Sequence, residues 1–231
     1  MLSRGRLFAG AALVLVLIGA LGGTFFSRPI KAGLEPGPML RLVRATFDPL
    51  VEVPDWPAEL LQKAARPEKV GLYLVQFEGP IQKEWKAALR RQGVQLFDYV
   101  PDYAFLAWMN VDTAARVASE PHVRWVGFYQ PAYRFSPQLD RAAGRETVTV
   151  VTLPTVDAAA LQAQLERRGG VVLDVAMNDW AGYFRVQMAA NQLPALAHLP
   201  SVTWIEPYEP PRFFNDVAWG EGIMNAEAVW Q

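Results

Sequence analysis

Two stretches of the chain decide the fold: PHVRWVGFYQP at residues 121–131 and PSVTWIEPYEP at residues 200–210. Both carry a tryptophan, a tyrosine and a proline at the same spacing, and Trp125 lies 79 positions before its counterpart Trp204. A repeat of this length is too long for one unit of a solenoid and fits a duplicated small domain.

The repeat continues upstream of these two stretches. VGLYLVQF at residues 70–77 corresponds to ETVTVVTL at 146–153, and both are typical of strands because they are rich in β-branched and aromatic residues. The 88–108 stretch, ALRRQGVQLFDYVPDYAFLAW, corresponds to QLERRGGVVLDVAMNDWAGYFRV at 164–186. The chain therefore contains two copies of one structural plan.

The period of the apolar residues predicts the helices. Within residues 81–92, every fourth residue from Ile81 to Leu89 is apolar, which is typical of one helix face. Gly93 is suited to end this helix, and the alignment places Gly170 at the corresponding position of the second copy.

The remaining elements follow from alternation and turn signals. In the first copy we expect strands at 94–100 and 103–109 around a Pro101-Asp102 turn, a helix at 111–120 capped by Asp112, and a strand at 123–129. In the second copy we expect strands at 147–152, 171–176, 180–187 and 202–208, and helices at 157–168 and 191–198. The element order is β-α-β-β-α-β in both.

These elements predict an α+β fold. It consists of two tandem ferredoxin-like units, at residues 70–135 and 146–212, each with an antiparallel sheet and both helices on one face. A unit of this size is marginally stable alone. We therefore expect part of the uncovered sheet face to be buried against the other copy or against a partner.

The N-terminal region predicts export. Residues 7–26 carry no charge and follow Arg4 and Arg6, so residues 1–26 are interpreted as an apolar helix that serves as a signal peptide or a membrane anchor. Residues 27–69 contain seven prolines and are interpreted as a Pro-rich tether, extended or loosely packed, with one short helix near Pro57. The protein is expected to be secreted or to stay in the cell envelope.

Composition excludes several classes of site. The net charge of −1 does not favour nucleic acid, and any membrane contact is expected only through the N-terminal segment. The chain has no cysteine, and its two histidines disfavour a zinc site, so no metal or other cofactor is expected.

No catalytic residue can be assigned either. None of the five serines lies in a G-x-S-x-G motif, and no phosphate-binding glycine loop occurs. Asp102 and Asp179 lie at corresponding turns, where turn chemistry explains them, and His122 and His198 lie near helix ends. We expect the aromatic residues of the closing strands to pack on the sheets.

Three stretches resemble a known family. FDPLVEVPDWPAEL at 47–60 and GLYLVQFEGPIQKEW at 71–85 resemble the pro-regions of bacterial secreted subtilisin-like serine proteases. SVTWIEPYEPPRFFNDVAWGEGIMNAEAVW at 201–230 resembles the junction between such a pro-region and its catalytic domain. The resemblance extends over about residues 46–231.

This resemblance implies a function. The chain would be an intramolecular chaperone and a product-like inhibitor of a subtilisin-like catalytic domain, in cis or in trans after cleavage. Residues 213–231 would be the start of that domain, whose Asp, His and Ser motifs the chain lacks. The chain itself would then not be an enzyme, whereas its full-length parent would be a serine endopeptidase.

The resemblance also implies a cleft-binding tail, in which two prolines favour an extended backbone. The tail comprises Glu209, Pro210, Pro211, Arg212, Phe213 and Phe214, with processing between Phe214 and Asn215.

Two other readings stay open. Tandem ferredoxin-like units also serve as stand-alone exported binding or interaction modules, because the fold does not fix the function. In that case residues 215–231 should fold back and bury Trp219 and Trp230. The third possibility is an intact protease of which this chain is only the beginning.

Overall fold

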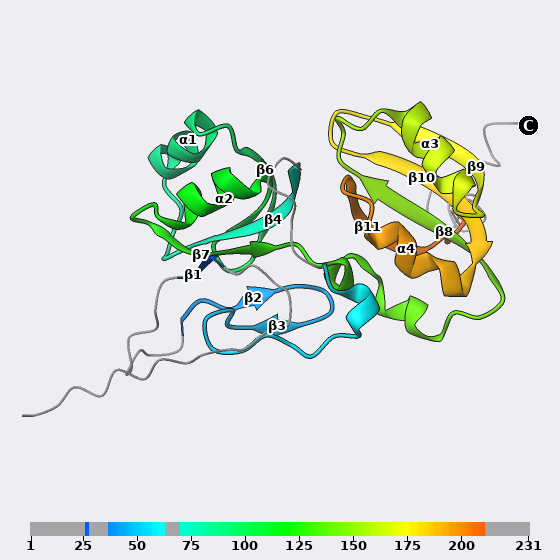
Figure 1. The fold of residues 1–231 in the computed structure, drawn as a ribbon, viewed down its shortest axis with the longest axis horizontal. Coiled ribbons are helices and arrows are strands. Elements are labelled where there is room, and N and C mark those ends of the chain that lie inside the picture. The colour runs from blue at the N-terminus through cyan, green and yellow to red at the C-terminus, as the bar shows by residue number, and fades with distance from the viewer. Residues whose placement is uncertain (1–25, 28–36, 63–69, 211–231) are drawn as a thin grey trace, which may run out of the picture.

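The computed structural model describes residues 26–27, 37–62 and 70–210. This part of the chain is an α+β structure of antiparallel sheets and four α-helices, as the sequence predicts. Figure 1 shows two similar halves side by side, with the segment that contains β2 and β3 beneath the first half. None of the described helices is long and apolar enough to cross a membrane. The apolar run of residues 7–26 lies outside the described residues except for Phe26.

The first half contains six elements in the predicted order. They are β4 (Val70–Phe77), α1 (Lys83–Arg91), β5 (Gln95–Val100), β6 (Ala104–Asn110), α2 (Val111–Ala118) and β7 (Val123–Phe128). The strands form the first sheet in the order β7-β4-β6-β5, and the short strand β1 (Phe26–Ser27) pairs with the outer edge of β7.

The second half repeats this plan. Its elements are β8 (Arg145–Thr152), α3 (Ala158–Arg167), β9 (Val171–Met177), β10 (Gly182–Ala189), the 3₁₀ turn η4 (Ala190–Gln192), α4 (Leu193–Ala197) and β11 (Val202–Pro207). The second sheet has the order β11-β8-β10-β9, which is the order of the first. Both closing strands contain a bulge at the same place, with Arg124 and Thr203 as the extra residues. The bulge confirms the 79-residue spacing.

Three local predictions need correction. The cap of α2 is Asn110, whose side chain accepts a hydrogen bond from the Thr113 N–H at 2.8 Å, and not Asp112, because the helix begins at Val111. The glycine equivalent to Gly93 is Gly169, since these two adopt positive φ values of 87° and 82° after α1 and α3. The alignment with Gly170 was therefore wrong by one residue.

The helix predicted at 191–198 is also shorter than expected. It is split into η4 and α4, and Pro194 lies in the first turn of α4. A proline clashes with the carbonyl four residues before it, so a continuous helix through Ala190 is disfavoured.

In both halves the helices cover one face of the sheet. Leu89 of α1 and Val117 of α2 are buried on the first sheet. Leu161 and Leu165 of α3 and Leu196 of α4 are buried on the second sheet. Every second strand residue faces the helices and completes these cores. In the second sheet these residues include Val148, Val150, Phe184 and Val186.

The opposite face of the first sheet is covered by residues 37–62, which we call the strap. The strap contains β2 (Leu40–Arg41), β3 (Thr46–Phe47) and the 3₁₀ turn η1 (Ala58–Leu60). Leu40 and Phe47 are buried against a group of sheet residues that includes Leu72, Leu74 and Leu106. This part of the tether is extended in β2 and β3, which is one of the two expected alternatives, but it is buried on the sheet and not loosely packed. Prolines exclude helix but permit extended chain, which can lie flat on a sheet.

A polar cluster fixes the strap to the sheet. Arg124, the bulge residue of β7, forms an ion pair with Asp48 of the strap at 2.6 Å and donates to Gln76 Oε1 at 2.8 Å. The Gln76 side-chain N–H donates to the Pro38 carbonyl at 3.0 Å. Asp48 and Gln76 are both buried. Each buried polar group thus has a partner, which a stable buried cluster requires.

The linker between the halves contains η2 (Pro131–Arg134) and η3 (Pro137–Arg141). It adds to the edge of the second sheet: Phe135 bridges Ile205, and the Ser136 N–H donates to the Ile205 carbonyl at 2.8 Å. The Arg134 side chain donates to the carbonyls of Ala197, Leu199 and Val202 in the second half and to that of Tyr129 in the first. The two halves are therefore joined by specific bonds.

Candidate functional site

The face of the second sheet opposite α3 and α4 is the main candidate site, and we call it the open face. Its side chains alternate with the core residues of the same strands. Across the four strands they form three rows: Trp204, Val151, Tyr183 and Ala176 (the aromatic row); Glu206, Thr149, Arg185 and Asp174 (the charged row); Tyr208, Thr147, Gln187 and Val171 (the polar row). The part of the chain that the structure describes places no second strap over this face.

The corresponding positions of the first sheet differ in chemistry. They carry Leu72, Leu74, Leu106, Trp108 and Trp125, which pack in the apolar cluster beneath the strap. The strand pairing places Thr147 and Thr149 where β4 has Leu72 and Leu74, so the sequence alignment of residues 70–77 with 146–153 is wrong by one residue. An apolar face suits permanent burial, whereas a mixed aromatic and polar face remains soluble until a partner covers it.

The charged row is paired within itself and with the two neighbouring rows. Arg185 forms an ion pair with Asp174 at 2.6 Å, donates to the Tyr208 hydroxyl at 2.8 Å and lies 4.6 Å from the centre of the Tyr208 ring. The Trp204 indole N–H donates to Glu206 at 3.0 Å. These contacts hold the polar side chains in defined positions, which lowers the entropy cost of covering them.

The predicted tail leaves from the polar row. The Tyr208 N–H donates to the Thr147 carbonyl at 2.9 Å, which extends the pairing by one residue beyond β11. Glu209 and Pro210 follow and are exposed. Pro211, Arg212, Phe213, Phe214 and Asn215 lie outside the described residues, so the proposed processing site has no structural description.

The β9–β10 hairpin lies at the other end of the open face. Trp180 at its turn is 85% exposed, the most exposed of the large apolar side chains in the described chain. The corresponding hairpin of the first half is held by the strap: the Asp102 N–H donates to the Met39 carbonyl at 2.9 Å, and Arg41 pairs with the Asp102 carboxylate at 3.2 Å.

The other candidates are structural in their contacts. His122 stacks on Trp85 with ring centres 4.4 Å apart, and His198 Nε2 lies 2.6 Å from the Glu59 carbonyl oxygen of the strap. Asp102 and Asp179 belong to different hairpins in different halves. Among the described residues, no group of three or more histidine or carboxylate side chains could hold a metal ion.

The most strongly perturbed titratable groups lie at the junction of the halves. Burial lowers the pKa of Arg134 to about 10. Burial raises the pKa of Tyr129 to about 12, although the neighbouring Arg134 charge opposes this shift. Arg134 is 2% exposed and bonded to backbone carbonyls. We therefore interpret this cluster as an inter-domain clasp and not as an active site.

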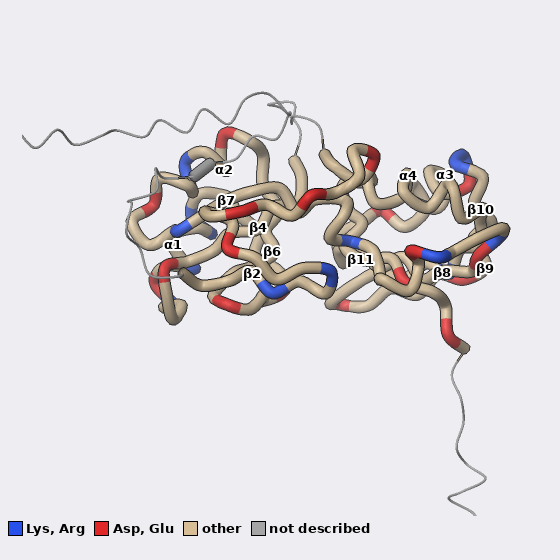
Figure 2. The backbone as a smooth tube through the Cα atoms, turned by 90° about the horizontal axis from the view of Figure 1, so that it is seen from below, with Lys and Arg blue, Asp and Glu red and all other residues tan. Residues whose placement is uncertain are grey.

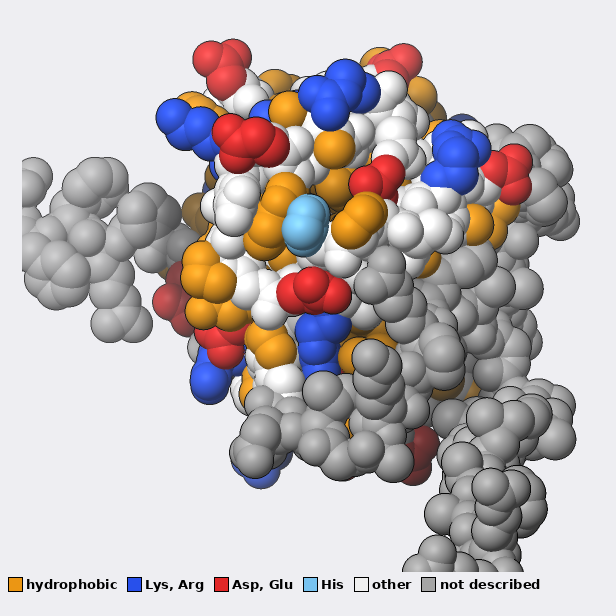
Figure 3. Space-filling model, turned by 90° about the vertical axis from the view of Figure 1, so that its left-hand side faces the viewer, with side chains coloured by type: hydrophobic (Ala, Val, Ile, Leu, Met, Phe, Trp, Pro, Cys, Tyr) orange, Lys and Arg blue, Asp and Glu red, His pale blue; other side chains and the backbone are white. Residues whose placement is uncertain are grey.

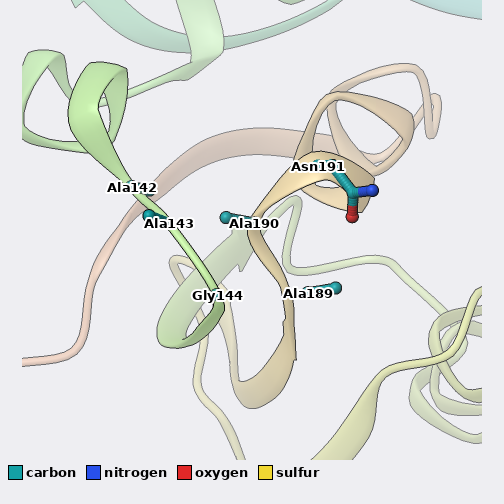
Figure 4. A pocket seen from close by; sticks show the side chains of 6 residues that line it. All are labelled: Ala142, Ala143, Gly144, Ala189, Ala190 and Asn191. Carbon is teal, nitrogen blue, oxygen red and sulfur yellow. The ribbon is translucent and has the colours of Figure 1, made fainter.

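A shallow pocket of about 530 Å³ lies where the linker passes η4. Figure 4 shows the Ala190 methyl group pointing toward the linker segment, while the Asn191 side chain points away. The lining residues are Ala142, Ala143, Gly144, Ala189, Ala190 and Asn191. This lining has no ionisable side chain, so it offers no acid, base or nucleophile.

Charges of both signs are mixed along the described part of the chain (Figure 2). Figure 2 shows acidic and basic residues interspersed along both halves. The end of the first half in Figure 3 likewise mixes charges of both signs with small apolar areas. Neither view shows the basic stripe typical of a nucleic-acid interface.

The comparisons with known proteins identify one family model. A model described as Domain of unknown function (DUF8729) matches residues 41–130. This region comprises most of the strap and nearly all of the first half. No curated protein and no solved structure matches the chain.

Sequence reasoning missed the residues that distinguish the open face. Tyr183, Arg185 and Gln187 alternate with apolar residues along β10, and this period of two could have indicated an uncovered face. Trp180 was expected to begin the strand at 180–187, but β10 begins at Gly182 and Trp180 lies in the turn, where no other segment of the described chain covers it.

Proposed function

We propose that the chain is the pro-region of an exported subtilisin-like serine protease, acting as intramolecular chaperone and product-like inhibitor of the catalytic domain. Residues 1–26 direct export, and the chain has no peptidase activity of its own. The observation that carries this proposal is the open face together with the tail that leaves from its edge. A half-exposed aromatic and polar face next to a Pro-rich strand exit suits docking on a protein.

The arrangement of the strands supports the fold behind this proposal. In each half the closing strand lies beside the first strand, and the third strand separates the first from the second. This order, with both helices on one face, is that of a split β-α-β unit. We therefore infer two tandem ferredoxin-like units, at residues 70–135 and 146–212, and the beginning of the catalytic domain at residues 213–231.

The second unit is the one that docks in this proposal. The strap already fills the open side of the first sheet, where Leu40 is 0% and Phe47 is 2% exposed. The tail starts at the second sheet, and the six residues from Tyr208 to Phe214 span at most about 20 Å when extended. A catalytic cleft that holds the tail must therefore lie next to the second unit.

The tail would occupy that cleft as an extended product. Pro210 and Pro211 favour extended chain, which is the conformation that pairs with a protease groove. Phe214 would fill the primary specificity pocket, with processing between Phe214 and Asn215, and Glu209 to Phe213 would line the groove before it.

Docking explains both proposed roles. A preformed sheet offers a surface on which a catalytic domain with many long-range contacts can fold, which lowers a barrier that is high for such topologies. After cleavage the same contacts stabilise the folded enzyme by mass action and block its cleft.

The test compares two versions of the exported chain, one ending at Phe214 and one ending at Tyr208. The longer version should inhibit peptide hydrolysis by a subtilisin-type protease competitively, and the shorter version should inhibit at least tenfold more weakly. Phe214→Asp in the longer version should resemble the truncation. Equal rates of hydrolysis with and without saturating amounts of the longer chain would refute the proposal.

A second candidate function is a stand-alone exported binding module. The family model that matches residues 41–130 includes most of the strap and the first half and not the tail, and it assigns no function to them. If the chain is such a module, the chain ending at Gln231 should protect Trp204 from solvent quenchers better than the chain ending at Pro210. A pro-region predicts equal quenching of the two.

A further inference from the structure

The high exposure of Trp180 is not explained by the tail or by the open face. The residue is 85% exposed on a hairpin that extends beyond the aromatic row, and Met177 and Tyr183 beside it are 41% and 39% exposed. Exposed tryptophan is uncommon on a surface that only meets water, and buried tryptophan is frequent among the residues that dominate the energy of protein interfaces.

The turn that carries Trp180 is well ordered by its own hydrogen bonds. The Asn178 side-chain oxygen accepts from the Trp180 N–H at 2.9 Å and from the Ala181 N–H at 2.8 Å. The Asn178 N–H donates to the Ala181 carbonyl at 3.0 Å. The backbone that carries the indole is thus fixed, which lowers the backbone entropy cost of binding it.

The first half shows how the same hairpin position is used when it has an occupant. There the strap supplies backbone partners on both sides of the turn: the Asp102 N–H donates to the Met39 carbonyl, and the Arg41 N–H donates to the Pro101 carbonyl. The Trp180 hairpin has no strap within the described chain. It keeps its shape by the Asn178 turn and offers an aromatic side chain instead.

The hairpin and the tail lie at opposite ends of the open face. Thr152 pairs with Gly182 at the hairpin end of β8, and Thr147 receives the Tyr208 N–H at the tail end. Five residue steps along a strand are about 17 Å. A catalytic domain that holds the tail and lies on the open face would therefore reach the hairpin.

We propose that Trp180 is an anchor residue for the catalytic domain, inserting into an apolar pocket of that domain while the tail occupies its cleft. This inference rests on the proposed function and adds a second point of attachment. Two attachment points at the ends of one face would fix the orientation of the docked unit. The tail alone, joined through a single extended strand, would leave that orientation free.

The experiment uses the exported chain ending at Phe214 and a subtilisin-type protease as the probe. Trp180→Ala should raise the inhibition constant at least tenfold, because a buried tryptophan anchor is lost. The matched control is Tyr99→Ala, which removes a 51% exposed aromatic from β5 of the first half and should change the constant less than twofold. Thermal unfolding should show that both variants are folded.

The outcomes separate this inference from the proposed function. Inhibition by the wild-type chain with an unchanged constant for Trp180→Ala would overturn the anchor and leave the pro-region proposal intact. Absence of inhibition by the wild-type chain would overturn both. Loss of binding to phosphatidylglycerol vesicles in Trp180→Ala, with unchanged inhibition, would assign the indole to a membrane surface and overturn the protein partner.

Discussion

At the scale of single residues, Arg134 is the most informative position. Its guanidinium is buried and donates only to backbone carbonyls, among them Ala197 and Leu199 at the end of α4. Carbonyls at a helix C-terminus carry partial negative charge, so they stabilise a cation without a carboxylate. The hydrogen bonds of the clasp therefore form only when α4, and with it the second half, is in its native position.

Replacing Arg134 should destabilise the whole described fold. Arg134→Met leaves the carbonyls of Tyr129, Ala197 and Val202 without this donor, and we expect a loss of about 3 kcal/mol in the free energy of unfolding. Urea unfolding followed by circular dichroism measures it. Arg134→Lys keeps the charge but cannot reach all the carbonyls, so it should lie between wild type and Arg134→Met. A loss below about 0.5 kcal/mol for Arg134→Met would contradict the clasp.

Buried phenols make the protein sensitive to alkali. Burial raises the pKa of Tyr73 and of Tyr129 to about 12, and that of Tyr133 also rises. The stability that these groups contribute is complete below pH 10 and is lost as the pH rises through about 12. Arg134 acts in the opposite sense above pH 10, because its folded pKa is lowered. The stability lost by ionising three phenols exceeds the stability gained by deprotonating one guanidinium.

We therefore expect unfolding between pH 10 and 12, with each unit of pKa shift worth about 1.4 kcal/mol. In an alkaline titration, the near-ultraviolet absorbance of tyrosinate and the far-ultraviolet circular dichroism should change over the same pH range. Tyr73→Phe should move the midpoint to higher pH. Complete ionisation of the tyrosines with unchanged circular dichroism would contradict this expectation.

At the scale of elements, the sequence predicts the repeated strands and helices well and the strap poorly. Alternation and the Trp125–Trp204 spacing depend on local chemistry, so they place β7 and β11 correctly. The strap lacks such a period, and its burial depends on a sheet face that forms only in the folded protein. The prolines of the strap indicate loose chain by local propensity, which does not report tertiary contacts. Trp180 was missed for the same reason.

The strap should contribute a large share of the stability of the first half. Its Asp48–Arg124 ion pair is buried, with the two side chains 7% and 13% exposed. Asp48→Ala leaves the guanidinium without its anion, and we expect a loss of about 3 kcal/mol. The double variant Asp48→Ala, Arg124→Met should lose less than the sum of the two single variants. Chemical unfolding of the four proteins tests this, and additive losses would contradict a direct coupling.

At the scale of the whole molecule, the strap and the linker connect both halves into one structure. Leu60 of η1 packs against the cores of both halves. Arg44 of the strap pairs with Asp140 of the linker at 2.8 Å, and His198 of the second half contacts the Glu59 carbonyl. The open face on the second half is therefore held in a fixed position relative to the first half. The first half, whose own sheet is covered by the strap, can thus stabilise the docking surface without contacting the partner.

This connection predicts cooperative unfolding. The chain from residue 37 to 214 should unfold in a single urea transition when tryptophan fluorescence and circular dichroism are compared, because neither half can lose its structure without breaking the clasp. Combining Leu60→Ala with Arg134→Met removes an apolar and a polar connection, and this double variant should show two transitions. The two transitions should differ in their relative amplitudes by fluorescence and by circular dichroism, since the tryptophans are distributed unequally between the halves. Two transitions in the wild-type chain would show that the halves are independent, and one transition in the double variant would show that other contacts of the strap are sufficient to couple them.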